Sequence, residues 1–402
     1  MVSNLGDSEF EGKPRFMRVL VQWLTATVCC VVCAPAGCTG NGLVSAGIPA
    51  APIAPTPVIL APIATTATAK FAYTGNQGAS LSGYSVNTST GALTALNGFP
   101  VSIGANPTVV AVDPQNRFLF VGDIALSELH VFAINSSTGA LSEVGASPYG
   151  TVKEPVAIAV DPAGTHVYVT GQGSHSVGGF TVSGAGDLTP IAGSPFATSG
   201  NRDYEDDVVV NAAGTFVYAQ DLDNIYTYSV NASSGAVTLI QTVPSPLSVG
   251  GIALDPHGTY LYAVGSGANS IVAYSVDAST GLLMLAGTSP LFYQDGAYTI
   301  SISPTGQFAY TIEKNNYLVS YVLSDGVFTH IGTVYSQVYG QRIGINPSGS
   351  FVYVPQACGN CPGGVYNVVN AFSIGSTGAL TRFPGVPVAA GTTPWGIAIT
   401  SQ

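Results

Sequence analysis

The sequence predicts an all-β fold, a seven-bladed β-propeller whose ring is closed by a strand from the C-terminus. Three marks recur between residues 70 and 402: a strand ending in an aromatic residue, a hairpin containing a glycine, and an alternating strand followed by a turn resembling D-P-x-G. The aromatic residues are 43 to 50 positions apart, and each repeat has room for about four strands. Repeats of this length and content are typical of propeller blades.

The aromatic residue marks the second strand of each predicted blade, and the glycine marks the hairpin that follows. The aromatic residues are Tyr73, Phe120, Tyr168, Tyr218, Tyr262, Tyr310 and Tyr353. The hairpin glycines are Gly91, Gly139, Gly186, Gly235, Gly281, Gly326 and Gly378. Because both marks occur seven times, we expect seven blades with core aromatics and tight turns.

The third mark, the innermost strand with its turn, occurs only six times. Its anchors are Asp113, Asp161, Asn211, Asp255, Ser303 and Asn346. The missing strand is at the other end of the chain, where residues 395–400 (WGIAIT) align with residues 156–161 (VAIAVD). The C-terminus therefore completes the first blade, which removes the exposed ends of a linear array. No stretch after residue 70 has helical periodicity of useful length, which excludes an α/β fold.

The N-terminal residues predict export. Arg15 and Arg18 precede an apolar run over residues 19–33 that is short for a membrane span, as in a signal peptide, and Met17 is an alternative start to Met1. Residues 34–36 (APA) fit an ordinary cleavage site, whereas residues 36–38 (AGC) resemble a lipobox that would lipidate Cys38. We assign residues 1–38 to the extension and signal peptide, 39–69 to an Ala/Pro/Thr-rich linker, and 70–402 to the propeller. The expected location is periplasmic, outer-membrane-anchored or extracellular in a bacterium.

The charge of the chain limits the kinds of molecule that it is expected to bind. Charged residues make up 8% of the chain, the net charge is −11, and the seven cations after residue 69 form no basic stripe. This excludes nucleic acid as a partner and leaves a lipid anchor as the only expected membrane contact. We expect a monomer that binds a small-molecule or glycan ligand, or an envelope protein.

The repeat, with its D-P-x-G turn, aromatic second strand and T-G-A-L hairpin, resembles the lactonase-type seven-bladed propellers. That family includes bacterial 6-phosphogluconolactonase and fungal muconate cycloisomerase, and the resemblance covers residues 70–402. It implies a small lactone or sugar-derived ligand at the top of the central channel. Family enzymes are expected to carry His at the starts of innermost strands, and none of the seven starts here has one. The scarcity of cations also disfavours 6-phosphogluconolactone itself, since a phosphate needs Arg or Lys partners.

Two functions remain open, a lactonase (a carboxylic ester hydrolase) and a non-catalytic envelope or surface propeller that binds a protein or glycan. For hydrolysis, a carboxylate would activate water and a guanidinium would stabilise the oxyanion. The catalytic candidates at the starts of the innermost strands are Glu154, Glu205, Arg202 and Arg342. The ligand-binding candidates on the same face are His175, Tyr204, Tyr298, Gln341 and Trp395. Structural ion pairing is the alternative account of the four charged residues.

An acidic cluster is the best candidate for a divalent cation site. It contains Glu205 and Asp207 together with the four expected metal ligands, Asp203, Asp206, Asp221 and Asp223. Converging carboxylates suit a divalent cation such as calcium, although no EF-hand-like spacing is present and a solvated acidic loop is the alternative.

Two cysteines belong to the predicted propeller. Cys358 and Cys361 lie in the loop QACGNCPGG, which runs into proline and glycine instead of the helix that a redox pair requires. A zinc site would need two more ligands. In an oxidising compartment we therefore predict a disulfide between them.

Overall fold

The computed structural model describes residues 70–198, 205–245, 250–265, 267–314, 316–335, 342–357, 367–383 and 387–401. They belong to one compact unit, Ala61–Gln402. The predicted signal peptide, Cys38 and the linker lie outside the described residues. Within these ranges the chain forms strands and turns only, so no apolar helix of membrane-spanning length occurs there.

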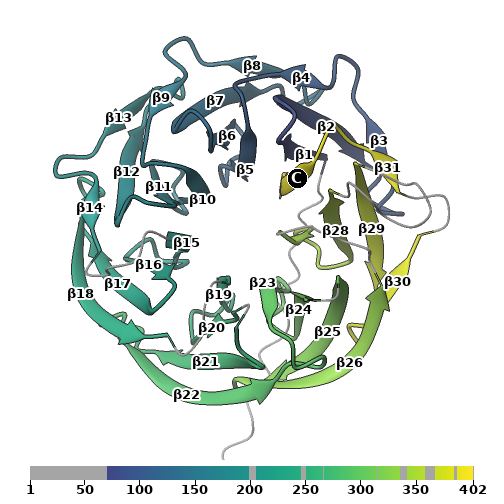
Figure 1. Cartoon of the computed structure of the whole chain (residues 1–402). Helices are drawn as coiled ribbons and strands as arrows, with labels where there is room; N and C mark the ends of the chain where they lie inside the picture. The colour runs from purple at the N-terminus through teal and green to yellow at the C-terminus, as the bar shows by residue number, and fades with distance from the viewer. Residues whose placement is uncertain are drawn as a thin grey trace, which may run out of the picture. The chain divides into compact units, whose positions relative to one another are not determined.

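Seven antiparallel sheets follow one another around a ring, which confirms the predicted propeller (Figure 1). We number the blades 1 to 7 by chain order of their second strands. The innermost strands are β32 (Pro394–Ile399), β5 (Pro107–Val112), β10 (Pro155–Val160), β15 (Glu205–Val210), β19 (Ile252–Leu254), β23 (Ala297–Ile302) and β27 (Gly344–Ile345). The second strands are β1 (Phe71–Asn76), β6 (Phe118–Asp123), β11 (His166–Gly171), β16 (Phe216–Asp221), β20 (Tyr260–Ala263), β24 (Phe308–Glu313) and β28 (Phe351–Gln356). The third strands are β2 (Ser80–Val86), β7 (Glu128–Ile134), β12 (Ser176–Val182), β17 (Asn224–Val230), β21 (Ser270–Val276), β25 (Tyr317–Ser324) and β29 (Val368–Ile374).

The outermost position of a blade is filled in two ways. Blades 4, 5 and 6 have one long strand each, β18 (Val237–Pro244), β22 (Leu283–Pro290) and β26 (Val327–Tyr335). In blades 1, 2, 3 and 7 two short strands pair with the third strand instead: β3 (Leu93–Ala95) and β4 (Val101–Ser102), β8 (Leu141–Glu143) and β9 (Tyr149–Gly150), β13 (Leu188–Pro190) and β14 (Phe196–Ala197), and β30 (Leu380–Arg382) and β31 (Val388–Ala389). The third strand is therefore paired on both edges in every blade.

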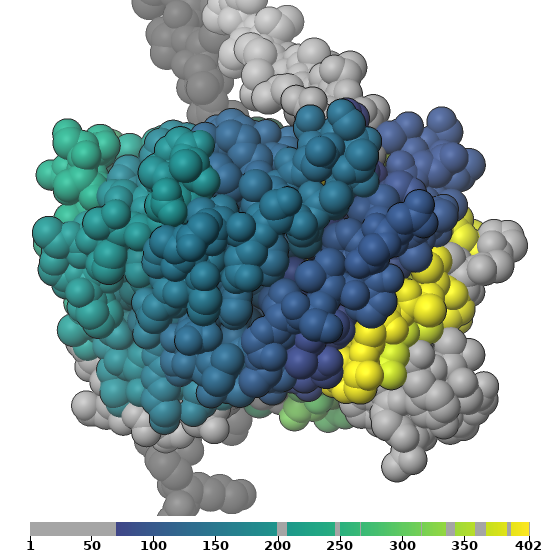
Figure 2. Space-filling view, turned by 90° about the horizontal axis from the view of Figure 1, so that it is seen from above, coloured from purple at the N-terminus to yellow at the C-terminus, as the bar shows by residue number. Residues whose placement is uncertain are grey.

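The C-terminal strand closes the ring as predicted. Strand β32 pairs with β1, with Thr74 opposite Ile397, and the chain's C end is marked beside β1 in Figure 1. Figure 2 shows the same closure in space-filling form, with yellow C-terminal residues against the purple first strands. The hydroxyl oxygen of Thr400 accepts hydrogen bonds from the N–H groups of Lys70 (3.2 Å) and Phe71 (3.0 Å). Thr400 thus caps the start of the second strand of blade 1, as the turn anchors do in the other blades.

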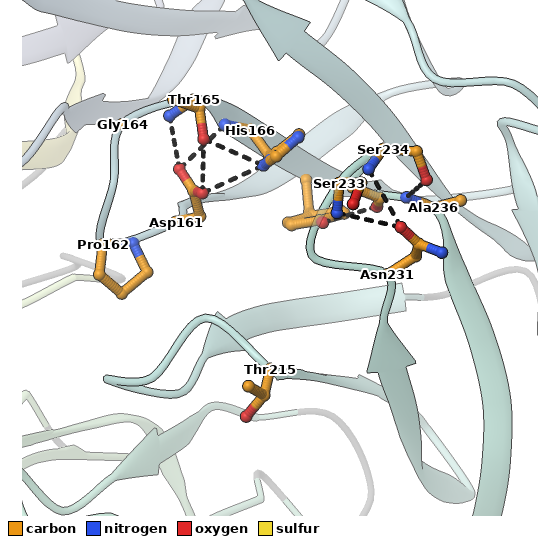
Figure 3. Close-up of polar contacts among 12 residues, drawn as sticks. Asp161, Pro162, Gly164, Thr165, His166, Thr215, Asn231, Ser233, Ser234 and Ala236 are labelled. Atoms are coloured by element: carbon orange, nitrogen blue, oxygen red, sulfur yellow. Dashed lines mark hydrogen bonds and ion pairs between the residues drawn. The ribbon is translucent and has the colours of Figure 1, made fainter.

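The anchor of each turn holds the start of the second strand. In blade 3, Oδ1 of Asp161 accepts hydrogen bonds from the N–H groups of Thr165 (2.6 Å) and His166 (2.9 Å), and Oδ2 accepts one from the Thr165 hydroxyl (Figure 3). Such side-chain caps satisfy backbone donors that a tight turn leaves unpaired. The innermost strand begins at what we call the top face, and this turn defines the bottom face.

The aromatic and glycine marks contact each other across neighbouring blades. The tyrosine of one blade donates its hydroxyl proton to the carbonyl oxygen of the hairpin glycine in the next blade, in the pairs Tyr73–Gly139, Tyr168–Gly235, Tyr218–Gly281, Tyr310–Gly378 and Tyr353–Gly91. The first residue of the same strand covers the glycine, so that a Cβ atom on Gly91 would lie 2.5 Å from the ring of Phe351. The core is likewise shared between blades: Ile225 of blade 4, for example, packs in one buried cluster with Leu261 and Val272 of blade 5.

Candidate functional site

An ion pair joins residues from distant blades at the centre of the ring. Arg342 precedes β27 in blade 7, and Asp207 lies in β15 of blade 4. Nη1 of Arg342 lies 2.9 Å from Oδ2 of Asp207, and Nη2 donates a hydrogen bond of 3.1 Å to the carbonyl oxygen of Val156 in blade 3. Oδ2 of Asp207 also accepts a hydrogen bond of 3.2 Å from the N–H group of Ile252 in blade 5. The pair therefore connects the inner strands of four blades.

Both charged groups are largely removed from water. The side chain of Asp207 is 10% exposed and that of Arg342 is 24% exposed. A charge in such a place is tolerated when an opposite charge is close and hydrogen bonds satisfy the remaining sites. Asp207 and the Val156 carbonyl together hold the planar guanidinium in one orientation, which is the condition for directed electrostatic stabilisation of a reacting group.

A cavity of about 460 Å³ lies along the innermost strands of blades 4 to 7, with Arg342 and Asp207 among its lining residues. Its volume is within the range of small-molecule sites, roughly 300–1,000 Å³. Most of its lining side chains are aliphatic, with Ile252, Leu254, Ile300, Ile302, Ile343 and Ile345 among them, but polar and apolar atoms contribute about equally to its surface. The lining also includes Pro304, in the turn after β23, so the cavity runs from the ion pair toward the bottom face.

Arg342 and Asp207 occupy the same position in their repeats, four residues before the turn anchor. The other repeats have uncharged residues there, Val109, Ala157, Gly251, Thr299 and Gly396. The sequence reasoning treated Asp207 only as part of the acidic cluster and missed its pairing with Arg342. Comparing the seven repeats position by position would have found it, because this position carries a charge in only two repeats and the two signs are opposite.

Glu154 lies two residues before Val156, whose carbonyl oxygen accepts the hydrogen bond from Arg342. Its carboxylate is 40% exposed and lies 3.4 Å from Nζ of Lys153. Its backbone is left-handed, with φ at 49°. Thr393 and Gly296, at the same position of blades 1 and 6, also have positive φ, so this conformation belongs to the repeat and is not a strain particular to Glu154. The structure thus brings Glu154 to the strand that Arg342 reaches.

The expected ligand-binding residues that the structure describes lie at the top face. Tyr298 and Trp395 lie at the repeat position of Val156, and both are partly buried. His175 is in the loop between β11 and β12, where its carbonyl oxygen accepts a hydrogen bond of 2.9 Å from the N–H group of Thr198. None of these observations assigns a ligand, so their roles stay predictions.

Asp221, one of the expected metal ligands, caps a turn. It is fully buried at the end of β16 and accepts hydrogen bonds from the N–H groups of Asp223 (2.8 Å) and Asn224 (2.6 Å) and from the Tyr226 hydroxyl (2.5 Å). Asp123 caps the corresponding turn of blade 2 in the same way. Among the described residues, no three His, Cys, Asp or Glu side chains come close enough to hold a metal ion.

Several predicted residues lie outside the described part of the chain, and their roles stay predictions. They are Arg202, Asp203, Tyr204, Gln341, Cys358 and Cys361, together with the side chains of Glu205 and Asp206.

Solved structures with the same architecture are similar to nearly the whole propeller. The periplasmic gluconolactonase of Pseudomonas aeruginosa matches with a TM-score of 0.67 and 18% identity, over 82% of this chain and 99% of that one. A candidate 6-phosphogluconolactonase from Bacteroides uniformis matches with a TM-score of 0.71 and 16% identity, over 82% and 98% of the two chains. A protein from Lactobacillus plantarum gives 0.70 and 18%, over 82% and 99%. At these identities the likeness establishes the fold alone.

Comparison with protein-family models shows more than the structural likeness does, because it identifies a family as well as a fold. No curated protein matches the chain. The family model described as "Lactonase, 7-bladed beta-propeller" matches residues 46–160 and 155–294, which together make up more than half of the sequence. With the seven-sheet ring and the shared repeat, this match shows that the chain belongs to the family of seven-bladed β-propeller lactonases.

Proposed function

We propose that this protein is an exported lactonase that binds a small uncharged lactone at the top of its central channel and hydrolyses it. The observation that carries the proposal is the Arg342–Asp207 ion pair, a fixed guanidinium beside a carboxylate in a largely buried site. Because the two charges offset each other, the site has no net charge that would favour a phosphorylated lactone. The likeness to a periplasmic gluconolactonase supports both the reaction class and the location.

The proposed reaction needs one base and one oxyanion donor. A carboxylate takes a proton from water while the water oxygen attacks the lactone carbonyl carbon, and the guanidinium of Arg342 stabilises the negative charge on the carbonyl oxygen. The ring C–O bond then breaks, and the leaving alkoxide takes the proton back from the carboxylic acid to give a hydroxy acid. Asp207 is the described carboxylate that contacts Arg342, and Glu154 is the second candidate.

A non-catalytic propeller that binds an envelope protein or glycan is the rival proposal. Exposed apolar side chains on the outer strands of blades 5 and 6 favour it, since Met284 is 71% exposed, Leu285 66% and Val327 58%. Exposed apolar side chains of this size can mark a contact with another protein. This surface is remote from the innermost strands, so the two proposals separate in one set of mutants.

The proposal is tested by measuring whether the mature protein hydrolyses a panel of lactones, with and without a chelator. The release of acid reports the reaction. Arg342→Ala is expected to lower kcat/KM by about 100-fold, since loss of one oxyanion donor has this effect in other hydrolases. Glu154→Ala is expected to lower it at least about tenfold if Glu154 is the base, and Asp207→Asn if Asp207 is. A fall with chelator would implicate the expected calcium.

Arg382→Ala is the matched control, because Arg382 lies in the outer strand β30 and donates a hydrogen bond to Asn370 within its own blade. It should leave hydrolysis unchanged. Thermal melting must show that each variant is folded, because removing Arg342 leaves the Asp207 carboxylate buried without its partner. A wild-type protein that hydrolyses no lactone, or a folded Arg342→Ala variant with full activity, contradicts the proposed mechanism.

A further inference from the structure

Four aromatic rings gather near the top of the outer rim between blades 5 and 6. They belong to Phe292 and Tyr293, in the segment that joins β22 to β23, to Tyr317 at the start of β25, and to His330 in the outer strand β26. The rings of Phe292 and His330 are stacked, with their centroids 3.8 Å apart. Those of Tyr293 and Tyr317 are stacked as well, at 4.4 Å. Strands β22 and β26 are neighbours on the outside of the ring, so these four residues, which we call the rim cluster, lie away from the innermost strands and their ion pair (Figure 1).

The rim cluster exposes aromatic surface to solvent. Phe292 is 46% exposed and is the only exposed phenylalanine among the described residues. Because His330 covers one face of its ring, the exposed part lies at the opposite face and the edge. His330 is itself exposed, and Tyr293 and Tyr317 are partly buried. Aromatic side chains gathered at the surface in this way can mark a binding site.

A buried carboxylate holds the backbone that carries two of these rings. Glu313, the last residue of β24, is fully buried, and its Oε2 accepts a hydrogen bond of 2.8 Å from the N–H group of Tyr293. Its Oε1 accepts one of 2.5 Å from the Tyr321 hydroxyl, whose oxygen accepts one of 2.9 Å from the N–H group of Phe292. Burial, together with the hydrogen bond to Glu313, raises the pKa of Tyr321, so this hydroxyl stays a donor. The two rings are thereby fixed before any ligand arrives, which reduces the entropy lost on binding.

Polar groups accompany the rings of the rim cluster. Gln294 and Asp295 follow Tyr293 along the chain, and both are exposed. The N–H group of Lys314 donates a hydrogen bond of 2.9 Å to the carbonyl oxygen of Gly296, which ties the loop before β25 to this segment. A pyranose with equatorial substituents suits such a surface, because its C–H face can stack on the electron-rich face of an aromatic ring while its hydroxyl groups keep hydrogen-bond partners at the edge.

The rim cluster is too small for a stable contact with a folded protein, which takes about 20–30 residues a side. The exposed aliphatic side chains do not extend it, because Met284 and Val327 lie at the bottom ends of β22 and β26, where these strands begin. We infer that the rim cluster binds a glycan of β-linked pyranoses with equatorial substituents, one sugar ring stacking on Phe292. This site goes beyond the proposed lactonase activity and shares no residue with the Arg342–Asp207 pair.

Isothermal titration calorimetry of the mature protein with cellohexaose and chitohexaose tests the inference, because both are flat chains of such sugars. At least one hexaose should bind, and Phe292→Ala should weaken its binding at least about tenfold through loss of the stacked ring. Phe292→Tyr keeps a ring and should bind as the wild type does. Leu126→Ala is the matched control, because Leu126 is 49% exposed in the top loop of blade 2, and it should leave binding unchanged.

Saturation-transfer NMR of the wild-type protein gives a second test that requires no variant to fold. Irradiation of the aromatic protons of the protein should saturate the axial C–H protons of the bound hexaose more than those of its exocyclic methylene groups, since the sugar face lies on the ring. No binding of either hexaose, unchanged binding in folded Phe292→Ala, or saturation spread evenly over the sugar overturns the inference. Decaproline, a peptide that also docks on aromatic side chains, is titrated in parallel. Binding of decaproline that is lost in Phe292→Ala, with neither hexaose bound, would identify a peptide site and overturn the inference as well.

Discussion

A tyrosine hydroxyl forms the most regular polar link between neighbouring blades. In the described residues it occurs at five of the seven interfaces, and the Tyr218 hydroxyl donates a hydrogen bond of 3.0 Å to the carbonyl oxygen of Gly281. Burial raises the pKa of Tyr218 to about 12, because the phenolate form would lose its contact with water. The hydroxyl therefore stays protonated, and can donate this hydrogen bond, throughout the physiological pH range.

Tyr218→Phe tests this link, and Phe120, at the same place in blade 2, shows that phenylalanine fits the position. The variant should lose about 1 kcal/mol of unfolding free energy at pH 7, where the Gly281 carbonyl loses its donor. The wild-type contribution is fully present below pH 10, the ordinary tyrosine pKa, and is lost as the pH rises toward 12. The free energy of unfolding, measured by urea denaturation between pH 8 and 11, should therefore fall less steeply with pH in the variant than in the wild type. Parallel pH profiles would contradict this assignment.

The candidate site was only partly predictable at this scale. Arg342 and Glu154 follow from their places at strand starts, and each precedes an innermost strand, β27 and β10. The pairing of Arg342 with Asp207 joins residues 135 positions apart, and only the closed ring, with blades 4 and 7 on opposite sides of the channel, brings them together. A contact of this kind cannot be predicted when each strand start is considered by itself.

At the scale of strands and turns, the hairpin glycines have two requirements at once. Gly91 has φ at 71°, which favours glycine in any turn, and it is also covered by Phe351 from the last blade. The sequence revealed the glycine and the aromatic strand as separate marks, because each recurs at its own place in the repeat. That they touch across blades depends on the angle between neighbouring sheets, which no periodicity encodes.

Comparing Gly91→Ala with Gly258→Ala separates the effect of the left-handed backbone from that of the covering aromatic ring. Gly258 has φ at 69°, but a Cβ atom there would meet nothing within 4 Å. Gly258→Ala should therefore cost only the left-handed backbone, about 1–2 kcal/mol. Gly91→Ala should cost about 1–3 kcal/mol more, because the new methyl group must displace the Phe351 ring. Urea unfolding of both variants measures the difference, and equal losses would mean that the ring moves aside freely.

At the scale of the whole molecule, the number of blades and the closure of the ring were predictable because the repeats could be counted. The third mark was missing once at the start and present once at the end, and β32 indeed pairs with β1. The two kinds of outer strand were not predictable. They depend on how strands at the rim pair with the third strand, and the recurrent core positions of the repeat do not constrain them.

Deleting residues 394–402 should abolish cooperative folding. The deletion removes all of β32 and the Thr400 hydroxyl that holds the start of β1, so β1 would be left with an unpaired edge and the ring would be open between blades 7 and 2. Ile397 would also leave the buried cluster that it shares with Tyr353 of blade 7. Deleting only Ser401 and Gln402 is the matched control: it removes the hydrogen bond from the Ser401 N–H group to Asn116 but keeps β32, and should lower the melting temperature only slightly. Circular dichroism melting curves of both truncated proteins decide the matter. Because closure links every blade to two neighbours, its loss should broaden or abolish the unfolding transition. A cooperative melt at the wild-type temperature after the longer deletion would show that the ring does not depend on its C-terminal strand.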